Sequence, residues 1–131
     1  MLSPARPAPV GDRRILVTGF DPFGGQPINP SWIAVQALDG LELGGHRVVA
    51  AQLPTQFVHS LRALDELIER HRPVLVVCTG QAGGRSAISL ERVAINVNDA
   101  RIPDNLGLQP GDTPAIEEAP GGYVSTLPVK A

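Results

Sequence analysis

Two glycine-rich segments contain residue types that could bind a ligand or take part in a reaction. The first, GFDPFGG at residues 19–25, holds two of the chain's three phenylalanines and one aspartate. The second, GQAGGR at residues 80–85, contains an arginine and is followed by Glu91. Glycine turns can cradle phosphate groups, aromatic rings can form the walls of a flat pocket, and carboxylates can take part in acid–base chemistry. The elements around these segments decide between the possibilities.

The second segment is a poor match to a phosphate cradle. Such a cradle requires a glycine turn at the start of a helix, whereas the residues that follow GQAGGR have the pattern of a strand. The segment matches neither the dinucleotide glycine pattern nor a P-loop. The sequence therefore favours a tight turn with positive φ at Gly83 or Gly84 and a solvated Arg85, with an unrelated phosphate or nucleotide binder as the alternative.

Other reactive residue types leave alternatives open. Phe20 and Phe23 either close the end of a sheet or wall a ligand pocket, and Asp21 is either a turn residue before Pro22 or a reacting carboxylate. We expect Cys78 to be buried in the apolar run VLVVCTG and therefore inert. The three histidines have no ligand-like spacing, so we expect no metal site.

The elements that must position these residues alternate along the chain. Short β-branched runs ending in glycine or proline predict strands, and apolar residues at helical spacing predict helices. Asn29 is the expected N-cap of the first helix, with Pro30 in its first turn. The expected strands are 14–20, 47–55, 74–80 and 91–102, and the expected helices are 30–38 and 56–71.

Strands that alternate with helices predict an α/β fold with a mainly parallel sheet. Ligands of such sheets bind at the carboxyl ends of the strands. Three segments follow the first three expected strands, namely GFDPFGG, LPT and GQAGGR. We therefore expect these three segments to face one cleft.

Composition narrows the class of protein. A chain of 131 residues, 43% hydrophobic and 18% charged, is typical of one soluble globular domain, and residues 1–13 have the composition of a disordered leader. A net charge of -2 argues against nucleic acid as a partner. One cysteine excludes an internal disulfide, and no segment resembles a membrane span or a signal peptide, so we expect a cytoplasmic protein without a membrane partner.

Four ordered motifs resemble the N-terminal part of the pyroglutamyl peptidase I family, also called pyrrolidone-carboxylate peptidases. The motifs are VTGFDPFGGQPINPSW, LPTQF, GQAGGRSAISLERVAINVNDARIPDN and YVSTLPVKA. The resemblance spans residues 14–131 and implies a single three-layer α/β/α domain with a mainly parallel or mixed sheet. It also implies a cysteine peptidase that removes N-terminal pyroglutamate from peptides, needs no cofactor and forms homo-oligomers.

The resemblance carries residue roles to matching positions. Glu91 matches the glutamate of a Cys-His-Glu triad, which would orient the imidazole and stabilise its charged form. Phe20 and Phe23 match the walls of the pyroglutamyl pocket, and Arg101 matches an arginine that could polarise the scissile carbonyl. The other positions that match the pocket or its border are Asn29, Thr55, Gln81 and Ile102.

One departure from the family affects the expected activity. The family's nucleophilic cysteine and catalytic histidine lie in a C-terminal portion that has no counterpart in this sequence, and Cys78 matches a strand residue instead. We therefore expect a chain truncated at its C-terminus, which would be active only in a longer form. A catalytically inactive lactam-binding fragment or pseudo-enzyme is the alternative.

Overall fold

The computed structural model describes residues 12–130, which form two compact units. The first unit ends at Gln81 and the second begins at Ala82. The proposed leader at residues 1–13 falls mostly outside the described residues, although Arg13 already belongs to the first strand.

The first unit is built on a four-stranded sheet of mixed direction. The central strand β1 pairs in parallel with β3 on one side and β4 on the other, and β2 adds to β3 in the antiparallel sense. The strand order is β2-β3-β1-β4. The bounds are β1 Arg13–Phe20, β2 Glu42–Leu43, β3 His46–Leu53 and β4 Leu75–Cys78. The predicted mainly parallel or mixed sheet is confirmed, and β2 is an addition that the sequence pattern did not reveal.

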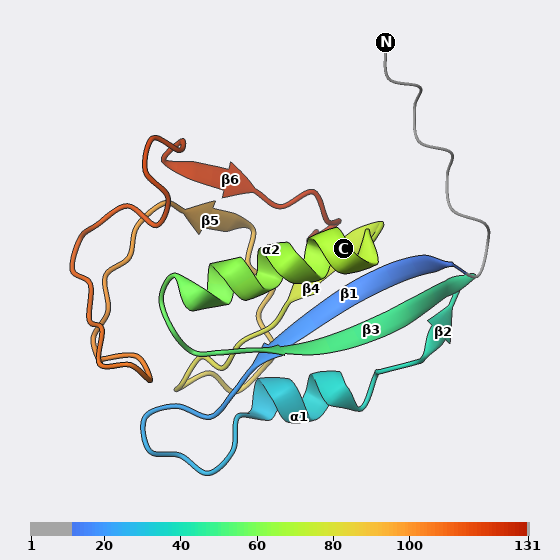
Figure 1. Ribbon diagram of the computed structural model, residues 1–131, viewed down its shortest axis with the longest axis horizontal. Helices are drawn as coiled ribbons and strands as arrows, with labels where there is room; N and C mark the ends of the chain where they lie inside the picture. The colour runs from blue at the N-terminus through green and yellow to red at the C-terminus, as the bar shows by residue number, and fades with distance from the viewer. Residues whose placement is uncertain (1–11, 131) are drawn as a thin grey trace. The chain divides into compact units, whose positions relative to one another are not determined.

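Two helices cover opposite faces of this sheet, which gives three layers (Figure 1). Helix α1 spans Pro30–Gln36 and helix α2 spans His59–His71. Under α1, the buried side chains of Val17, Val35 and Val48 form the centre of a small apolar core. The expected α/β/α layering is therefore present in the first unit.

Helix α1 begins where its capping residues predict. The Asn29 side chain accepts a hydrogen bond from the Ser31 backbone N–H, and Pro30 occupies the first helical position. The helix lies very close to β1, because a Cβ added at Gly19 would stand 2.8 Å from the Ser31 carbonyl group and from the Trp32 Cα. Only glycine allows this approach between strand and helix.

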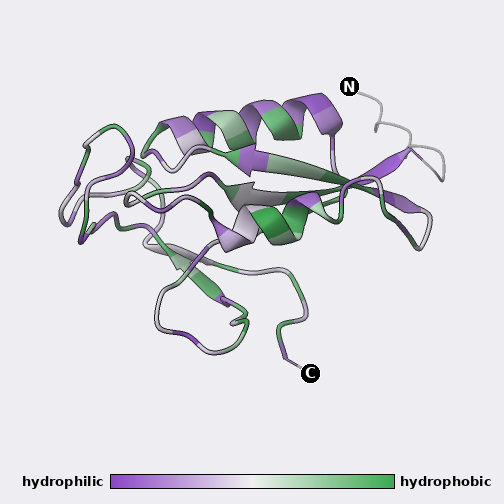
Figure 2. Ribbon diagram, turned by 90° about the horizontal axis from the view of Figure 1, so that it is seen from below, coloured by the Kyte–Doolittle hydropathy of each residue, from purple (hydrophilic) through white to green (hydrophobic). Residues whose placement is uncertain are grey.

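Helix α2 begins three residues later than expected. Residues 56–58 form a turn in which Val58 has a φ of 68°, so regular helical structure starts at His59. Arg70 and His71 occupy the last turn as expected, where the positive charge of Arg70 interacts favourably with the helix dipole. Hydrophilic and hydrophobic residues alternate along α2 in Figure 2, as in an amphipathic helix.

The second unit contains a short antiparallel pair of strands that are far apart in the sequence. Strands β5 (Val93–Ile95) and β6 (Gly122–Val124) pair in the antiparallel sense. The expected strand over 91–102 is wrong in length, because regular structure covers only three of its residues. Val93 and Ile95 are exposed, so the alternating pattern does not bury one face of β5 within this unit.

Candidate functional site

A pocket of about 200 Å³ lies at the carboxyl ends of β1, β3 and β4 in the first unit. It is walled mainly by apolar surface. Its volume is below the range of roughly 300–1,000 Å³ typical of drug-sized ligands, which suits a small ring. The lining residues are Phe20, Phe23, Asn29, Thr55, Gly80 and Gln81. The expected convergence of GFDPFGG, LPT and the start of GQAGGR on one cleft is confirmed.

The Phe20 side chain lies against the segment that follows β4. A Cβ added at Gly80 would stand 3.8 Å from two atoms of the Phe20 ring, which is ordinary van der Waals contact. The Phe20 backbone N–H donates to the Ser31 hydroxyl oxygen over 3.0 Å. Phe20 is therefore held at the junction of β1, α1 and the Gly80 turn, and it walls the pocket rather than merely closing the sheet end.

Asp21 connects two of the segments that line the pocket. Its carboxylate oxygen Oδ1 accepts from the Thr55 backbone N–H at 2.7 Å. Its backbone carbonyl accepts from the Thr55 hydroxyl at 3.1 Å and from the Asn29 amide at 3.0 Å. The Asp21 carboxylate thus acts in the loop structure, which favours the turn interpretation over that of a reacting group.

The Asn29 side chain is almost fully buried, with 2% of its surface exposed. Its Oδ1 accepts from both the backbone N–H and the hydroxyl of Ser31, at 3.0 and 2.8 Å. Its Nδ2 donates to the Asp21 carbonyl. These bonds fix which end of the amide is the donor, because the Ser31 backbone N–H can only donate.

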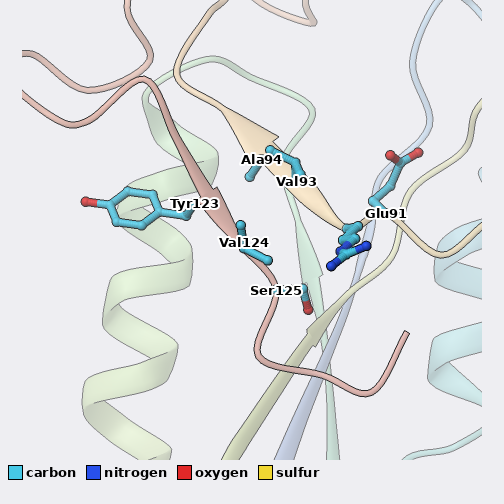
Figure 3. A pocket seen from close by; sticks show the side chains of 7 residues that line it. Glu91, Val93, Ala94, Tyr123, Val124 and Ser125 are labelled. Carbon is cyan, nitrogen blue, oxygen red and sulfur yellow. The ribbon is translucent and has the colours of Figure 1, made fainter. Parts of the chain in front are cut away.

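Glu91 lies in the second unit, just before β5 (Figure 3). It forms an ion pair with Arg85, whose Nη1 is 2.8 Å from Glu91 Oε1. Gly84 has a φ of 81°, which confirms the predicted left-handed turn, although Arg85 is paired as well as partly solvated. In Figure 3 the Glu91 carboxylate is directed away from the β5–β6 pair.

Glu91 also borders a cavity of about 180 Å³ on the β5–β6 pair. The other lining residues are Arg92, Val93, Ala94, Tyr123, Val124 and Ser125. Arg101 and Ile102, which the family resemblance linked to substrate, are exposed residues of the second unit and line neither of these two cavities.

Cys78 is exposed, so the expectation that it is buried in the core is wrong. It is the last residue of β4, which has a neighbour only on its β1 side in the four-stranded sheet. Its partner across the pair is Thr18. An apolar run predicts a strand, but whether that strand is central or lies at an edge depends on the order of the whole sheet.

Within residues 12–130, no three His, Cys, Asp or Glu side chains gather closely enough to hold a metal ion. None of the helices in the same range is long and apolar enough to cross a membrane.

His71 lies at the opposite end of β1 from the pocket, beside Arg14. Arg14 Nη1 is 2.8 Å from His71 Nδ1. Burial, followed by the charges of Arg14 and Arg70, lowers the pKa of His71 below its ordinary value. This contact requires an unprotonated Nδ1, because a guanidinium can only donate.

The sequence profile of the pyroglutamyl peptidases matches residues 13–131. The chain belongs to the pyroglutamyl peptidase family. It is 58% identical over 119 residues to the pyrrolidone-carboxylate peptidase of Yersinia pestis. The aligned residues cover 91% of this chain and 55% of the relative. The chain therefore spans about half the length of the curated relatives it matches.

Solved structures of the family have the same fold. The crystal structure of pyroglutamyl peptidase I from Bacillus amyloliquefaciens matches with a TM-score of 0.86 and 50% identity, over 89% of this chain and 56% of that one. A pyrrolidone carboxyl peptidase from Pyrococcus furiosus, the A199P mutant, matches with a TM-score of 0.86 and 45% identity, over 88% of this chain and 56% of that one. The α/β fold of the pyroglutamyl peptidases is thus confirmed.

Two residues of the pocket network were not predicted from sequence. Ser31 links Asn29 to the Phe20 backbone, and Gly80 lines the pocket beside the Phe20 ring. A serine two residues after an N-cap asparagine is a usable signal for Ser31, since it can donate to the same side-chain oxygen as its backbone N–H. The Asp21–Thr55 bond joins residues 34 positions apart and has no local signal.

Proposed function

We propose that this chain forms the lactam-binding part of a cysteine peptidase that removes N-terminal pyroglutamate from peptides. The observation that carries the proposal is the small pocket between Phe20, Phe23 and Thr55, in a chain that belongs to the pyroglutamyl peptidases. A five-membered lactam has apolar ring faces and one polar edge. Aromatic walls beside a hydroxyl and an amide suit both parts.

The pocket would discriminate against an open-chain glutamyl residue. An N-terminal glutamate carries an ammonium and a carboxylate, whereas the lactam ring carries neither. The six lining residues contain no charged side chain that could pair with either group. Burying these charges without partners costs several kcal/mol, on the order of the desolvation penalties measured for polar groups. Gln81 is the proposed polar contact at the pocket's border.

In the catalytic step, Glu91 would be the acidic member of a Cys-His-Glu triad. Its carboxylate would accept the imidazole N–H, fix the tautomer and stabilise the imidazolium that forms beside a thiolate. We propose that the thiol and the imidazole come from the part of the family's length that this chain does not span, and that Cys78 is not the nucleophile. Arg101 and Ile102 are proposed to border the substrate.

A second candidate function is lactam binding without turnover. The observation in its favour is that all six lining residues belong to the first unit, which contains neither Glu91 nor an evident thiol–imidazole pair. Binding by this chain would therefore not require the catalytic groups. We further propose a cytoplasmic location and a homo-oligomeric assembly for the intact enzyme.

Two measurements test these functions. Titration of residues 1–131 with L-pyroglutamamide, followed by NMR, should give saturable shifts at the Phe20 and Thr55 amides, and L-glutamate amide should not. Hydrolysis of a pyroglutamyl amide should be absent in this chain and present in a protein of the full family length. Equal rates of that longer protein on glutamyl and pyroglutamyl peptides would refute the pocket assignment.

A further inference from the structure

We propose that Asp21 is a positioning residue that gives the pocket its selectivity for a lactam over other five-membered rings, an inference that rests on the proposed function. Asp21 does not line the pocket. It acts through Thr55 and Asn29, which do.

Asp21 makes hydrogen bonds through its backbone and its side chain to the two segments that meet at the pocket. Its backbone N–H donates to the Leu53 carbonyl at 3.0 Å, which continues the pairing of β1 with β3 beyond the strand end. Its Oδ1 and its carbonyl both accept from Thr55, and the same carbonyl accepts from Asn29. The loop after β3 and the start of α1 are therefore tied to one residue.

These bonds decide which polar atoms a ligand can meet. The Thr55 hydroxyl proton is directed to the Asp21 carbonyl, so the Thr55 oxygen can present only lone pairs to the pocket. Asn29 Oδ1 already accepts two hydrogen bonds from Ser31, while one N–H of Asn29 Nδ2 is not used by Asp21. The polar edge thus offers an acceptor at Thr55 and a donor at Asn29. A lactam presents the complementary pair, an N–H next to a C=O.

The carboxylate strengthens this arrangement beyond what the backbone contacts provide. The 2.7 Å bond from the Thr55 N–H to Oδ1 has an ionised acceptor, and such bonds are about twice as strong as neutral ones. It fixes the Thr55 backbone, and so holds the hydroxyl within reach of the Asp21 carbonyl. Without this bond, the Thr55 hydroxyl could rotate and donate its proton into the pocket. A ring carbonyl could then accept that proton whether or not the ring also has an N–H, so the preference for a lactam would be lost.

The test compares two ligands on matched variants of the 131-residue chain. The ligands are L-pyroglutamamide and its cyclopentanone analogue, in which the ring N–H is replaced by CH₂. The variants are Asp21→Ala and Asp21→Asn. The control is Asp39→Ala, because Asp39 Oδ1 likewise accepts from a backbone N–H, that of Ala50 in β3 at 2.9 Å, but Asp39 does not line the pocket and neither does Ala50. Dissociation constants come from NMR titrations.

We expect the unchanged chain and Asp39→Ala to prefer the lactam equally. Asp21→Ala should lose that preference by about tenfold, which corresponds to the net contribution of one hydrogen bond between the lactam N–H and the Thr55 oxygen. Asp21→Asn should lose it by a smaller factor, because its side-chain carbonyl still accepts from the Thr55 N–H. This preference ratio responds to hydrogen-bond polarity, and a loss of fold stability alone would weaken both ligands together.

The possible results distinguish a failure of the proposed role of Asp21 from a failure of the proposed lactam-binding function. A lactam preference that is unchanged in Asp21→Ala overturns the role of Asp21 and leaves the lactam pocket standing. If Asp21→Ala does not fold, an unchanged preference in Asp21→Asn overturns the role in the same way. Failure of the unchanged chain to bind either ligand refutes the proposed pocket, and with it this inference.

Discussion

Replacing Gly19 with alanine tests the close packing of β1 on α1. The new Cβ would stand 2.8 Å from the Ser31 carbonyl carbon and oxygen and from the Trp32 Cα. All three are backbone atoms of a capped helix, so no flexible side chain can move aside. Relief requires α1 to shift away from the Val17–Val35 contact beneath it. We expect a loss of about 2–3 kcal/mol in the free energy of unfolding, as for overpacked cores.

This loss should be visible in both denaturant and heat. For a chain of this size it corresponds to a fall in Tm of roughly 6–15 °C, and to an earlier urea midpoint with an unchanged m-value. Far-UV circular dichroism is the main probe, and the fluorescence of Trp32, the chain's one tryptophan, reports directly on the contact.

The matched control is Gly80→Ala, where the added Cβ would make only 3.8 Å contacts with the Phe20 ring. Its stability should be unchanged, or raised by about 0.5 kcal/mol through the lower entropy of the unfolded chain. If Gly19→Ala and Gly80→Ala melt at the same temperature, the close approach of β1 and α1 is not a constraint and the reasoning is refuted.

Three further predictions concern the pocket, the triad and pH. Phe20→Ala should weaken L-pyroglutamamide binding by about tenfold or more in titrations, because one aromatic wall of the pocket is lost; unchanged affinity would contradict the pocket. In a protein of full family length, Glu91→Gln should lower kcat by on the order of a hundredfold with little change in Tm, since Glu91 is exposed; unchanged turnover would reject the triad role. The lowered pKa of His71 contributes stability that is present above about pH 6.5 and is lost as the pH falls through the folded-state pKa. His71→Gln should therefore flatten the dependence of the urea midpoint on pH in this range. Parallel pH profiles for the unchanged chain and for His71→Gln would show that His71 is not the group responsible.

Features set by neighbouring residues were predictable from sequence, and those set by sheet order were not. Asn29 and Pro30 identify the start of α1 because capping is local. The exposure of Cys78 was mispredicted, because its apolar run VLVVCTG does not reveal that β4 is the last strand of the sheet. The start of α2 was misplaced for a similar reason, since no local signal indicates the positive φ of Val58.

In the candidate site, too, some features could be predicted from the sequence and others could not. The carboxyl ends of three parallel strands meet at one edge, so the positions of Phe20 and Thr55 could be inferred from the alternation of strands and helices along the chain and from loop composition. The bond from the Thr55 N–H to Asp21 could not, because it depends on the register of β1 against β3. Register is set by packing of both faces of the sheet, which a single sequence pattern does not specify.

The place of β4 at the end of the four-stranded sheet also affects how this chain behaves in concentrated solution. The other end is protected, because β2 is only two residues long and contains Glu42. By contrast, Leu75, Val76 and Val77 give β4 an uncharged, aliphatic edge that lacks lysine or proline. In the first unit, the N–H and C=O groups on its outer side are paired with no strand of the sheet, so they can template a strand from another molecule. Self-association of this chain would therefore grow from one end of the sheet only, and a charged residue introduced into β4 would suppress it.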